Sequence, residues 1–187
     1  MAVDLGKAAG DVLGQTLADQ GFVVDGSSSS AVTFRDEQRL LELSYYPEDP
    51  TPWLSVVLGL RETSAELRVA LWRLFPEAPR LAAAENGQFS SSETLVDRLV
   101  TVRDAWLDQY IWPAFEQPER FRRAWLAQQD EAEQRYQAGV QDQRLRQARS
   151  AFDRGDLPEA VEQYPLAGID SLSAADRGRY IRARPRP

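Results

Sequence analysis

The sequence predicts an α+β protein, with an antiparallel sheet of three to four strands, helices packed on one face of it, and a C-terminal helical arm or hairpin. The first observation is the apolar spacing from Ala31 to Leu60, whose period of two is typical of half-exposed strands. The second is the order of the elements, because strands followed by helices favour this class over a doubly wound parallel sheet. The third is composition, since 43% hydrophobic and 27% charged residues are ordinary for a folded globular protein.

The first predicted helix spans about Val3 to Gln20. Its apolar residues recur every three or four positions and so share one face; they are Leu5, Ala8, Ala9, Val12, Leu13 and Leu17. Gly21 follows where a left-handed C-terminal cap is expected. Phe22 to Val24 then predict a short strand, because β-branched and aromatic residues favour strands.

A hairpin and a third long strand are predicted next. Residues 31–35 and 41–45 alternate apolar and polar side chains, and the polar residues 36–38 between them predict a turn. Residues 53–60 then predict a strand with its leucines and valines on one face. Ser64 is expected to cap a following helix whose apolar stripe consists of Leu67, Ala70, Leu71 and Leu74.

The longest helical pattern runs from Ser90 to Phe115. Ser90 and Glu93 have the spacing of a capping box, which predicts the start of the helix. Its apolar face is broad, so we expect this helix to cover the sheet. Pro113 lacks an amide proton and restricts the residue before it, so the helix is expected to stop or bend there, with Trp112 outside the helical region.

The charge distribution divides the chain near residue 117. Residues 1–117 contain 9 basic and 18 acidic side chains, whereas residues 118–187 contain 13 basic and 11 acidic ones. We therefore predict an acidic α+β domain over 1–117 and a helical arm over 118–187. Helical spacing continues in the arm with a narrow apolar stripe, and Gly139 is a candidate hinge; the stripe contains Phe121, Trp125, Ala132 and Tyr136.

A helical hairpin is predicted within residues 145–170. The residues that define it are Leu145, Ala148, Phe152, Gly155, Asp156, Ala160, Tyr164 and Ala167. Their spacing resembles a tetratricopeptide repeat, a family of protein-interaction scaffolds. The resemblance implies that Ala148 and Ala160 lie where two helices cross, that Gly155 forms the turn, and that Tyr164 and Ala167 pack between the helices.

The same residues also fit an ordinary helical hairpin. The bulky aromatic residue usual in the family falls near Arg144, Pro165 lies where the second helix should continue, and only one repeat is visible. Both interpretations keep two helices around Gly155. Ser173 and Asp176 predict a further capped helix that ends near Ala183.

The composition excludes several kinds of chemistry. The chain has no histidine and no cysteine, so it lacks the commonest general base, a thiol nucleophile and the usual zinc ligands. No glycine-rich phosphate loop, serine-nucleophile motif or calcium loop is present. We therefore expect no enzymatic activity, no cofactor and no metal. Without a visible signal peptide or membrane-spanning segment, a cytoplasmic location is expected.

These observations favour a non-enzymatic protein-interaction module (an adaptor, chaperone-like or immunity-like protein) that binds another protein, with a basic protein as a candidate partner. In size, charge and fold class the chain is similar to small bacterial immunity or adaptor proteins, an analogy that rests on no motif. Exposed aromatic and acidic residues suit such an interface, and the candidates are Tyr46, Glu48, Asp49 and Trp112.

Two alternatives use other residues. Asp36 with Glu37, and Glu48 with Asp49, are carboxylate pairs that could serve a small enzyme or a metal-dependent hydrolase. Residues 177–187 contain five arginines and no acidic residue, which could bind nucleic acid weakly. Nucleic acid is the less favoured partner, because the segment has only Tyr180 as a stacking aromatic.

Overall fold

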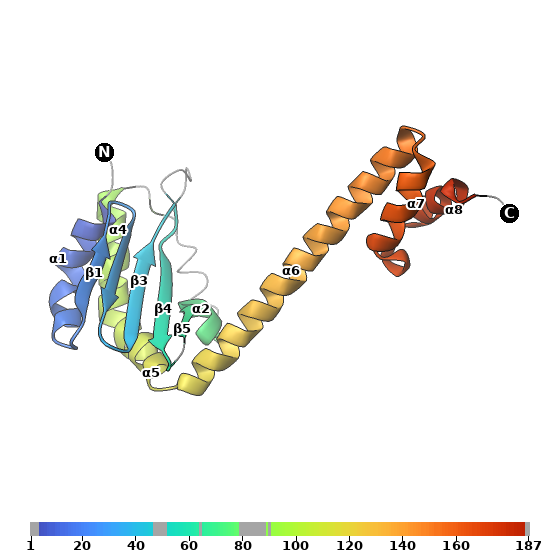
Figure 1. The fold of residues 1–187 in the computed structure, drawn as a ribbon. Helices are drawn as coiled ribbons and strands as arrows, with labels where there is room; N and C mark the ends of the chain where they lie inside the picture. Colours follow the sequence, from blue (N-terminus) through green and yellow to red (C-terminus); the bar gives the residue numbers. More distant parts are fainter. Residues whose placement is uncertain (1–3, 47–51, 64, 79–88, 90, 186–187) are drawn as a thin grey trace. The chain divides into compact units, whose positions relative to one another are not determined.

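The computed structural model describes residues 4–46, 52–63, 65–78, 89 and 91–185. Five antiparallel strands form one sheet in the order β1-β2-β3-β4-β5, which confirms the α+β class (Figure 1). The prediction of three to four strands was one strand short. The strands are β1 (Val23–Ser27), β2 (Ala31–Arg35), β3 (Arg39–Ser44), β4 (Ser55–Arg61) and β5 (Glu66–Ala70).

The additional strand is β5, in a segment where the sequence predicted a helix. Leu67 and Val69 are buried and Arg68 between them is exposed, which is the alternation of a strand. β5 pairs with β4 from Arg61 opposite Glu66 to Val57 opposite Ala70. Pairing with the edge strand β4 therefore outweighs the helical spacing of this segment. Of the predicted helix, only α2 (Leu71–Leu74) is helical. Ser64, the expected cap, lies outside the described residues.

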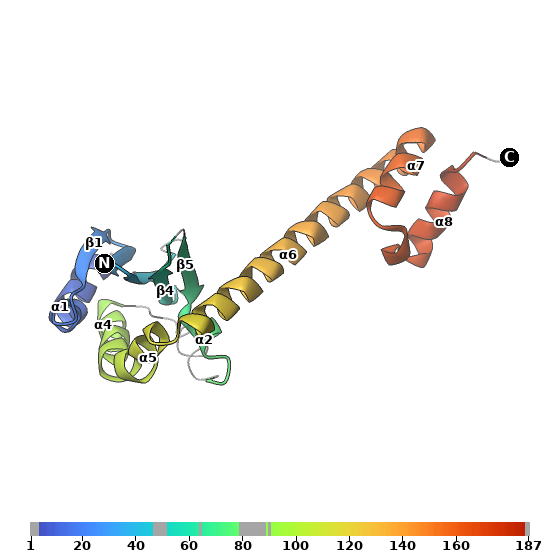
Figure 2. The same cartoon turned by 60° about the horizontal axis from the view of Figure 1, so that its bottom comes forward.

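The helices of this part of the chain lie on one face of the sheet (Figure 2). They are α1 (Leu5–Ala18), α4 (Ser92–Thr101), the π-helix η1 (Val102–Ile111) and α5 (Trp112–Phe115). The Asp4 carboxylate accepts a hydrogen bond from the Lys7 amide and caps α1. Gly21 has a φ of +86°, which confirms the left-handed residue predicted after this helix.

The start of α4 differs from the predicted capping box. Ser91, rather than Ser90, is the N-cap; its hydroxyl accepts from the Thr94 amide, and the Thr94 hydroxyl accepts from the Ser91 amide. Glu93 lies in the first turn and is exposed. A threonine hydroxyl thus takes the reciprocal role that the sequence pattern assigned to glutamate, and the box is displaced by one residue.

The helix also passes Pro113 instead of stopping there. Trp112 has φ −63° and ψ −48°, which is helical, and α5 ends at Phe115. In η1 the backbone bonds reach five residues back, and the Trp112 amide donates to the Leu107 carbonyl. Pro113 follows at the first turn of α5, where a missing amide proton is tolerated. The expected exclusion of Trp112 from the helix was therefore wrong.

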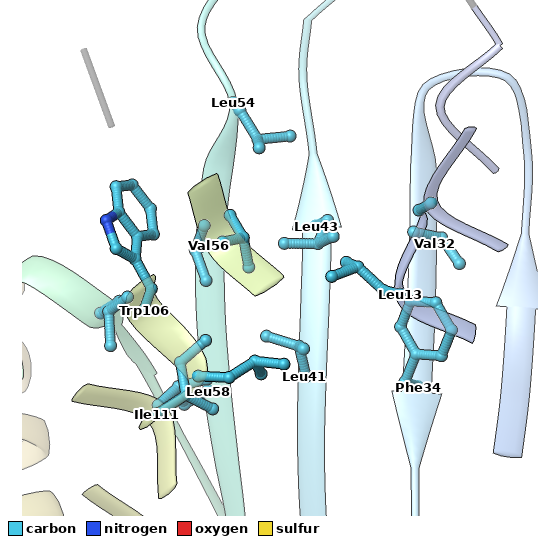
Figure 3. Close-up of a cluster of buried hydrophobic side chains, with 14 of the residues drawn as sticks. Leu13, Val32, Phe34, Leu41, Leu43, Leu54, Val56, Leu58, Trp106 and Ile111 are labelled. Atoms are coloured by element: carbon cyan, nitrogen blue, oxygen red, sulfur yellow. The ribbon is translucent and has the colours of Figure 1, made fainter. Parts of the chain in front are cut away.

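The core lies between the sheet and these helices (Figure 3). Phe34, Leu41, Leu58 and Val69 are neighbours across four strands, and Val32, Leu43 and Val56 form a second row. The helices cover these rows with Leu5, Ala9, Leu13, Leu17, Leu95, Leu99, Trp106 and Ile111. The predicted role of the segment from residue 91 to residue 115 in covering the sheet is confirmed.

Two compact units divide the chain, Met1–Gln128 and Gln129–Pro187. The boundary falls inside α6 (Pro118–Asp153), which continues through Gly139 without interruption. The second unit also contains α7 (Leu157–Leu166), the short 3-10 helix η2 (Ile169–Ser171) and α8 (Ala174–Ala183). None of the helices among the described residues combines the length and the apolar character that crossing a membrane requires.

The predicted helical hairpin around Gly155 is present in the second unit. Gly155 has a φ of +81°, Ala148 and Ala160 are fully buried, and Tyr164 packs with them. Small side chains at these positions let α6 and α7 approach closely. α7 continues through Pro165 and ends one residue later. The capped helix predicted after Ser173 is α8, and it ends at Ala183 as expected.

Candidate functional site

Trp112 belongs to an internal aromatic cluster, whereas the sequence suggested an exposed residue. Its ring lies 5.8 Å from that of Phe22 and 6.3 Å from that of Phe115. The side chain is half-buried and packs against the core. A π-helix turns less per residue than an α-helix, so every side chain after η1 is rotated away from its α-helical projection. The sequence pattern, read with α-helical spacing, could not show this rotation.

Arg39 joins this aromatic cluster to the turn between β2 and β3. Its guanidinium carbon lies 4.8 Å from the ring centre of Phe22, 5.7 Å from that of Phe115 and 5.9 Å from that of Trp112. These cation–π contacts hold one side of the guanidinium group. On the other side of this group, the Arg39 Nε donates a hydrogen bond to Asp36 Oδ2 at 2.6 Å. Sequence reasoning missed Arg39, because its aromatic partners lie at distant positions along the chain.

Asp36, a member of the carboxylate alternative, has a structural role in this turn. Partial burial opposes its ionisation, but the backbone amides of Gln38 and Arg39 and the Arg39 guanidinium outweigh it and hold the pKa of Asp36 below its usual value. Asp36, Glu37, Gln38 and Arg39 line a shallow hollow with Gly21. A carboxylate that stays ionised and fully engaged is poorly suited to proton transfer near neutral pH.

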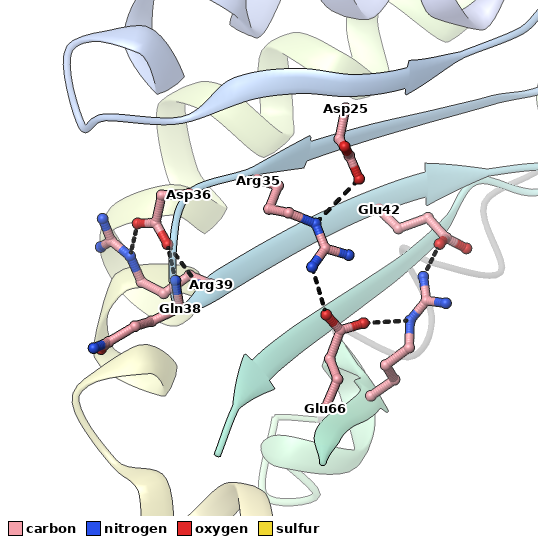
Figure 4. Close-up of polar contacts among 8 residues, drawn as sticks. Asp25, Arg35, Asp36, Gln38, Arg39, Glu42 and Glu66 are labelled. Atoms are coloured by element: carbon pink, nitrogen blue, oxygen red, sulfur yellow. Dashed lines mark hydrogen bonds and ion pairs between the residues drawn. The ribbon is translucent and has the colours of Figure 1, made fainter. Parts of the chain in front are cut away.

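The face of the sheet away from the helices carries paired charges (Figure 4). Arg35 donates from Nε to Asp25 at 3.1 Å and from Nη1 to Glu66 at 2.8 Å. Arg68 binds Glu42 and lies 3.7 Å from Glu66. The five side chains come from β1, β2, β3 and β5, and their charges are largely neutralised by one another. Because these charged groups pair with one another, this face of the sheet is better suited to stabilising the fold than to binding a charged ligand.

Tyr46 and Trp53 are the exposed aromatic residues at the connection between β3 and β4. The Tyr46 side chain is 72% exposed, as the sequence predicted, and Trp53 is 40% exposed. They border residues 47–51, in which Glu48 and Asp49 lie outside the described residues. Neighbouring Tyr45 is buried and its ring meets that of Phe89 edge-on at 5.2 Å. Just after the end of β3, the Tyr45 amide donates to the Ser30 carbonyl at 2.9 Å, so Tyr45 stays in the core while Tyr46 is exposed.

The second unit contains a buried ion-pair network around Asp176. Arg149 donates to both carboxylate oxygens, at 2.9 and 2.8 Å, and Arg179 adds a bond at 3.2 Å. The Ser173 hydroxyl donates to the same carboxylate at 2.5 Å. These bonds, led by that from Arg149, hold the pKa of Asp176 well below its usual range despite burial. Ser173 and Asp176 were predicted as a cap, but no sequence signal connects them to Arg149.

Tyr164 lies beside this network. Its hydroxyl oxygen is buried and has no hydrogen-bond partner within the described part of the chain. Burial, and then the nearby Asp176 carboxylate, raise the pKa of the Tyr164 hydroxyl. Tyr164 thus contributes mainly through packing, with its ring 5.9 Å from that of Tyr180.

The low pKa of Asp176 predicts how acid affects the second unit. Because the folded pKa lies below the ordinary value of 3.8, ionised Asp176 stabilises the folded unit above that value. The contribution is lost as the pH falls from 3.8 toward the lower folded pKa. We expect the difference in free energy of unfolding between the wild type and Asp176→Asn to be largest near neutral pH and to shrink below pH 3.8. Urea titrations at several pH values measure this difference. A difference that stays constant with pH would contradict a lowered pKa of Asp176 in the folded protein.

The arginine-rich end of the chain is largely engaged within the second unit. Arg177 donates to the Asp170 carbonyl, Arg179 binds Asp176, and Arg182 and Arg184 lie over the rings of Phe152 and Tyr180. Arg186 lies outside the described residues. The less favoured alternative, weak binding of nucleic acid by this segment, thus relies on side chains that already have contacts inside the protein.

No group of three or more acidic residues that could hold a metal ion occurs among the residues that the structure describes. Glu48 and Asp49 are outside that set, so their pairing stays a prediction. Comparison with protein-family models, with curated proteins and with solved structures gives no match.

Proposed function

We propose that the protein is a non-enzymatic, cytoplasmic interaction module that binds a basic partner protein through the surface around Tyr46. The observation that carries the proposal is the exposure of Tyr46 and Trp53 on either side of a segment that contains Glu48 and Asp49. Adaptor, chaperone-like and immunity-like proteins act in this way, by contact alone. We name this region, Tyr46, Glu48, Asp49 and Trp53, the aromatic–acidic surface.

The residue types support binding to a protein. Tyrosine and tryptophan are enriched at protein interfaces, where they bury large areas with little loss of side-chain entropy. Glu48 and Asp49, which lie between them in the sequence, favour a partner with arginine or lysine at the matching positions. The chain's net charge of −7 acts in the same direction, because it speeds encounter with a basic protein.

Trp112 no longer belongs to this proposal. Its ring packs against Phe22, Phe115 and Arg39 and is half-buried, so it offers a partner less free surface than the exposed Tyr46 does. Its place is taken by Trp53, which the sequence predicted at the start of a strand and which is 40% exposed. The second unit, whose hairpin resembles a tetratricopeptide repeat, is a second candidate surface for protein contacts.

A photo-crosslinking amino acid in place of Tyr46 tests the proposal. In the source cell we expect one discrete adduct from this position, because a bound partner lies within reach of an interface side chain. Reversing the charges with Glu48→Lys and Asp49→Lys should remove that adduct. Denaturing electrophoresis followed by mass spectrometry measures the adduct and identifies the partner.

Val23 provides the matched control. It is 66% exposed on β1, at the edge strand and away from the aromatic–acidic surface. The same crosslinker at this position should give no such adduct. The proposal fails if the two positions yield the same adducts, or if the adduct from position 46 survives the charge reversal.

A further inference from the structure

The part of α6 that belongs to the second unit begins as an exposed helix. Every residue from 129 to 139 is exposed. Tyr136 is the largest apolar side chain among them, and it is 66% exposed. Ala132 precedes it by four residues and Val140 follows by four, so the three side chains form a row along one face of the helix. The apolar stripe of the arm therefore lies at the surface in this part of α6.

Gly139 lies beside this row, three residues after Tyr136. Glycine in the interior of a helix costs about 1 kcal/mol relative to alanine. A Cβ at position 139 would meet no atom of the described residues within 4 Å, so packing within the described part of the chain does not require a glycine there. A residue without Cβ lets another backbone approach closely. The position thus suits contact with a second helix.

The charges on the two flanks of this row change sign along the helix. At 3.6 residues per turn, Glu133 and the later Arg144 lie on one flank of Tyr136. Arg135 and the later Asp142 lie on the other flank, in the opposite order of charge. When two copies of such a helix run antiparallel, the early part of one lies beside the late part of the other. Opposite charges then meet on both flanks.

We propose that two copies of the chain pair through this face of α6, with the two helices antiparallel. A two-fold axis beside Gly139 places Glu133 level with Arg144 of the second copy. The same axis places Arg135 level with Asp142 of the second copy, and symmetry repeats both contacts. A parallel pair would instead bring each charge next to its own copy, which is unfavourable.

Contacts within the second unit hold the first of these charge pairs in place. Arg144 donates to Gln163 of α7 at 3.1 Å, and Gln137 donates to the Glu133 carboxylate at 2.6 Å. Both groups therefore have little freedom to lose when they meet. An arginine has five N–H donors, so Arg144 can bind a carboxylate of the second copy without releasing Gln163.

The charges on the other flank contribute less. Arg135 and Asp142 already pair within their own helix, with Glu131 at 3.8 Å and with Arg146. Exposed ion pairs contribute at most about 1 kcal/mol each. The contact between the two helices is also short, so we expect the dimer to dissociate in the micromolar range.

This face of α6 is separate from the aromatic–acidic surface, and its partner is a second copy of the chain. Crosslinking at Tyr46 does not involve α6, and pairing of the helices does not involve Tyr46. The two proposals therefore succeed or fail independently.

Analytical ultracentrifugation of the full chain tests the proposal. We expect the mass to rise with concentration from 21.1 kDa toward twice that value. Glu133→Arg should raise the dissociation constant about tenfold, because it brings like charges together at position 144 of the second copy. Adding Arg144→Glu should restore the dimer. Within one chain the two positions are about 16 Å apart along the helix, so only pairing between copies can produce this rescue.

Asp130→Arg is the matched control. It makes the same change of charge in the same helix, and Asp130 is exposed farther from Tyr136 around the helix than Glu133 is. It should change the dissociation constant less than about twofold. A mass of 21.1 kDa at every concentration, equal weakening by Asp130→Arg and Glu133→Arg, or no rescue by the double substitution would overturn the proposal.

Introduced cysteines test the orientation of the two helices. The chain has no cysteine, so each variant carries a single thiol. Gly139→Cys places two thiols next to the two-fold axis, and nonreducing electrophoresis after mild oxidation should show a disulfide-linked dimer. Ala132→Cys should give none, because antiparallel pairing keeps its two copies roughly 20 Å apart. A disulfide-linked dimer of Ala132→Cys would show parallel pairing and refute the arrangement.

Discussion

Asp176→Ala is expected to destabilise the second unit by about 3 kcal/mol, because Asp176 is the one fully buried charged residue in the part of the chain that the structure describes. The carboxylate is fully buried and accepts hydrogen bonds from Arg149, Arg179 and Ser173. Its removal leaves the two arginines without their common anion and Ser173 without an acceptor. Because both arginine side chains reach solvent, at 42% and 33% exposure, we place the cost at the lower end of the range for broken buried ion pairs.

The positions of the tryptophans allow this loss of stability to be assigned to one unit. All five tryptophans precede residue 129, so tryptophan fluorescence reports only the first unit. Far-ultraviolet circular dichroism reports the helices of both. For Asp176→Ala we expect the midpoint of helix loss in urea to fall while the fluorescence midpoint is unchanged.

Asp170→Ala is the matched control. Asp170 is exposed, and its contact with Arg177 uses the backbone carbonyl, which the substitution keeps. The Asp170→Ala substitution should change the free energy of unfolding by no more than about 0.5 kcal/mol. A shift of both midpoints by Asp176→Ala would count against two separately unfolding units.

Gly6→Ala is expected to destabilise the first unit by about 1–3 kcal/mol, whereas Gly10→Ala on the same helix should stabilise it by up to about 1 kcal/mol. A Cβ at position 6 would lie 2.1 Å from the Ser27 hydroxyl oxygen and 2.6 Å from the Ser28 carbonyl oxygen. The Ser28 carbonyl is backbone that also accepts from the Gly6 amide, so it cannot move without losing that bond. Position 10 has no atom within 4 Å of its added Cβ.

Chemical denaturation followed by tryptophan fluorescence measures both variants. Both substitutions replace glycine by alanine in the same helix, so both change the intrinsic helix propensity equally. The difference between their free energies of unfolding therefore reports the close approach of α1 to the β1–β2 connection. Equal effects, or stabilisation by both, would show that α1 does not lie against Ser28 as described.

Local patterns in the sequence were sufficient for much of the fold. The period of two from residue 31 to residue 60 predicted the β2–β3 hairpin and β4, because one side of each strand faces the core. Gly21 and Gly155 marked the ends of helices, since only a residue without Cβ adopts positive φ at low cost. Ser173 predicted the start of α8.

The sequence failed where the deciding partner lies elsewhere in the chain. Leu67 to Ala70 fit a helix as well as a strand, and the open edge of β4 decided for β5. Trp112 looked exposed under α-helical spacing, and the π-helix η1 turned it toward Phe22. For the candidate sites, the sequence indicated Tyr46 by its alternation with the buried Tyr45.

By itself, then, the sequence determined the α+β class, the positions of most helices and strands, and the absence of histidine and cysteine chemistry, because these depend on residue identity and on spacing within one element. Only the tertiary structure decided the fifth strand, the aromatic contacts of Arg39 and the Asp176 network. Each of these joins side chains from separate elements. Their energies depend on distance in space, which no local pattern of residues encodes.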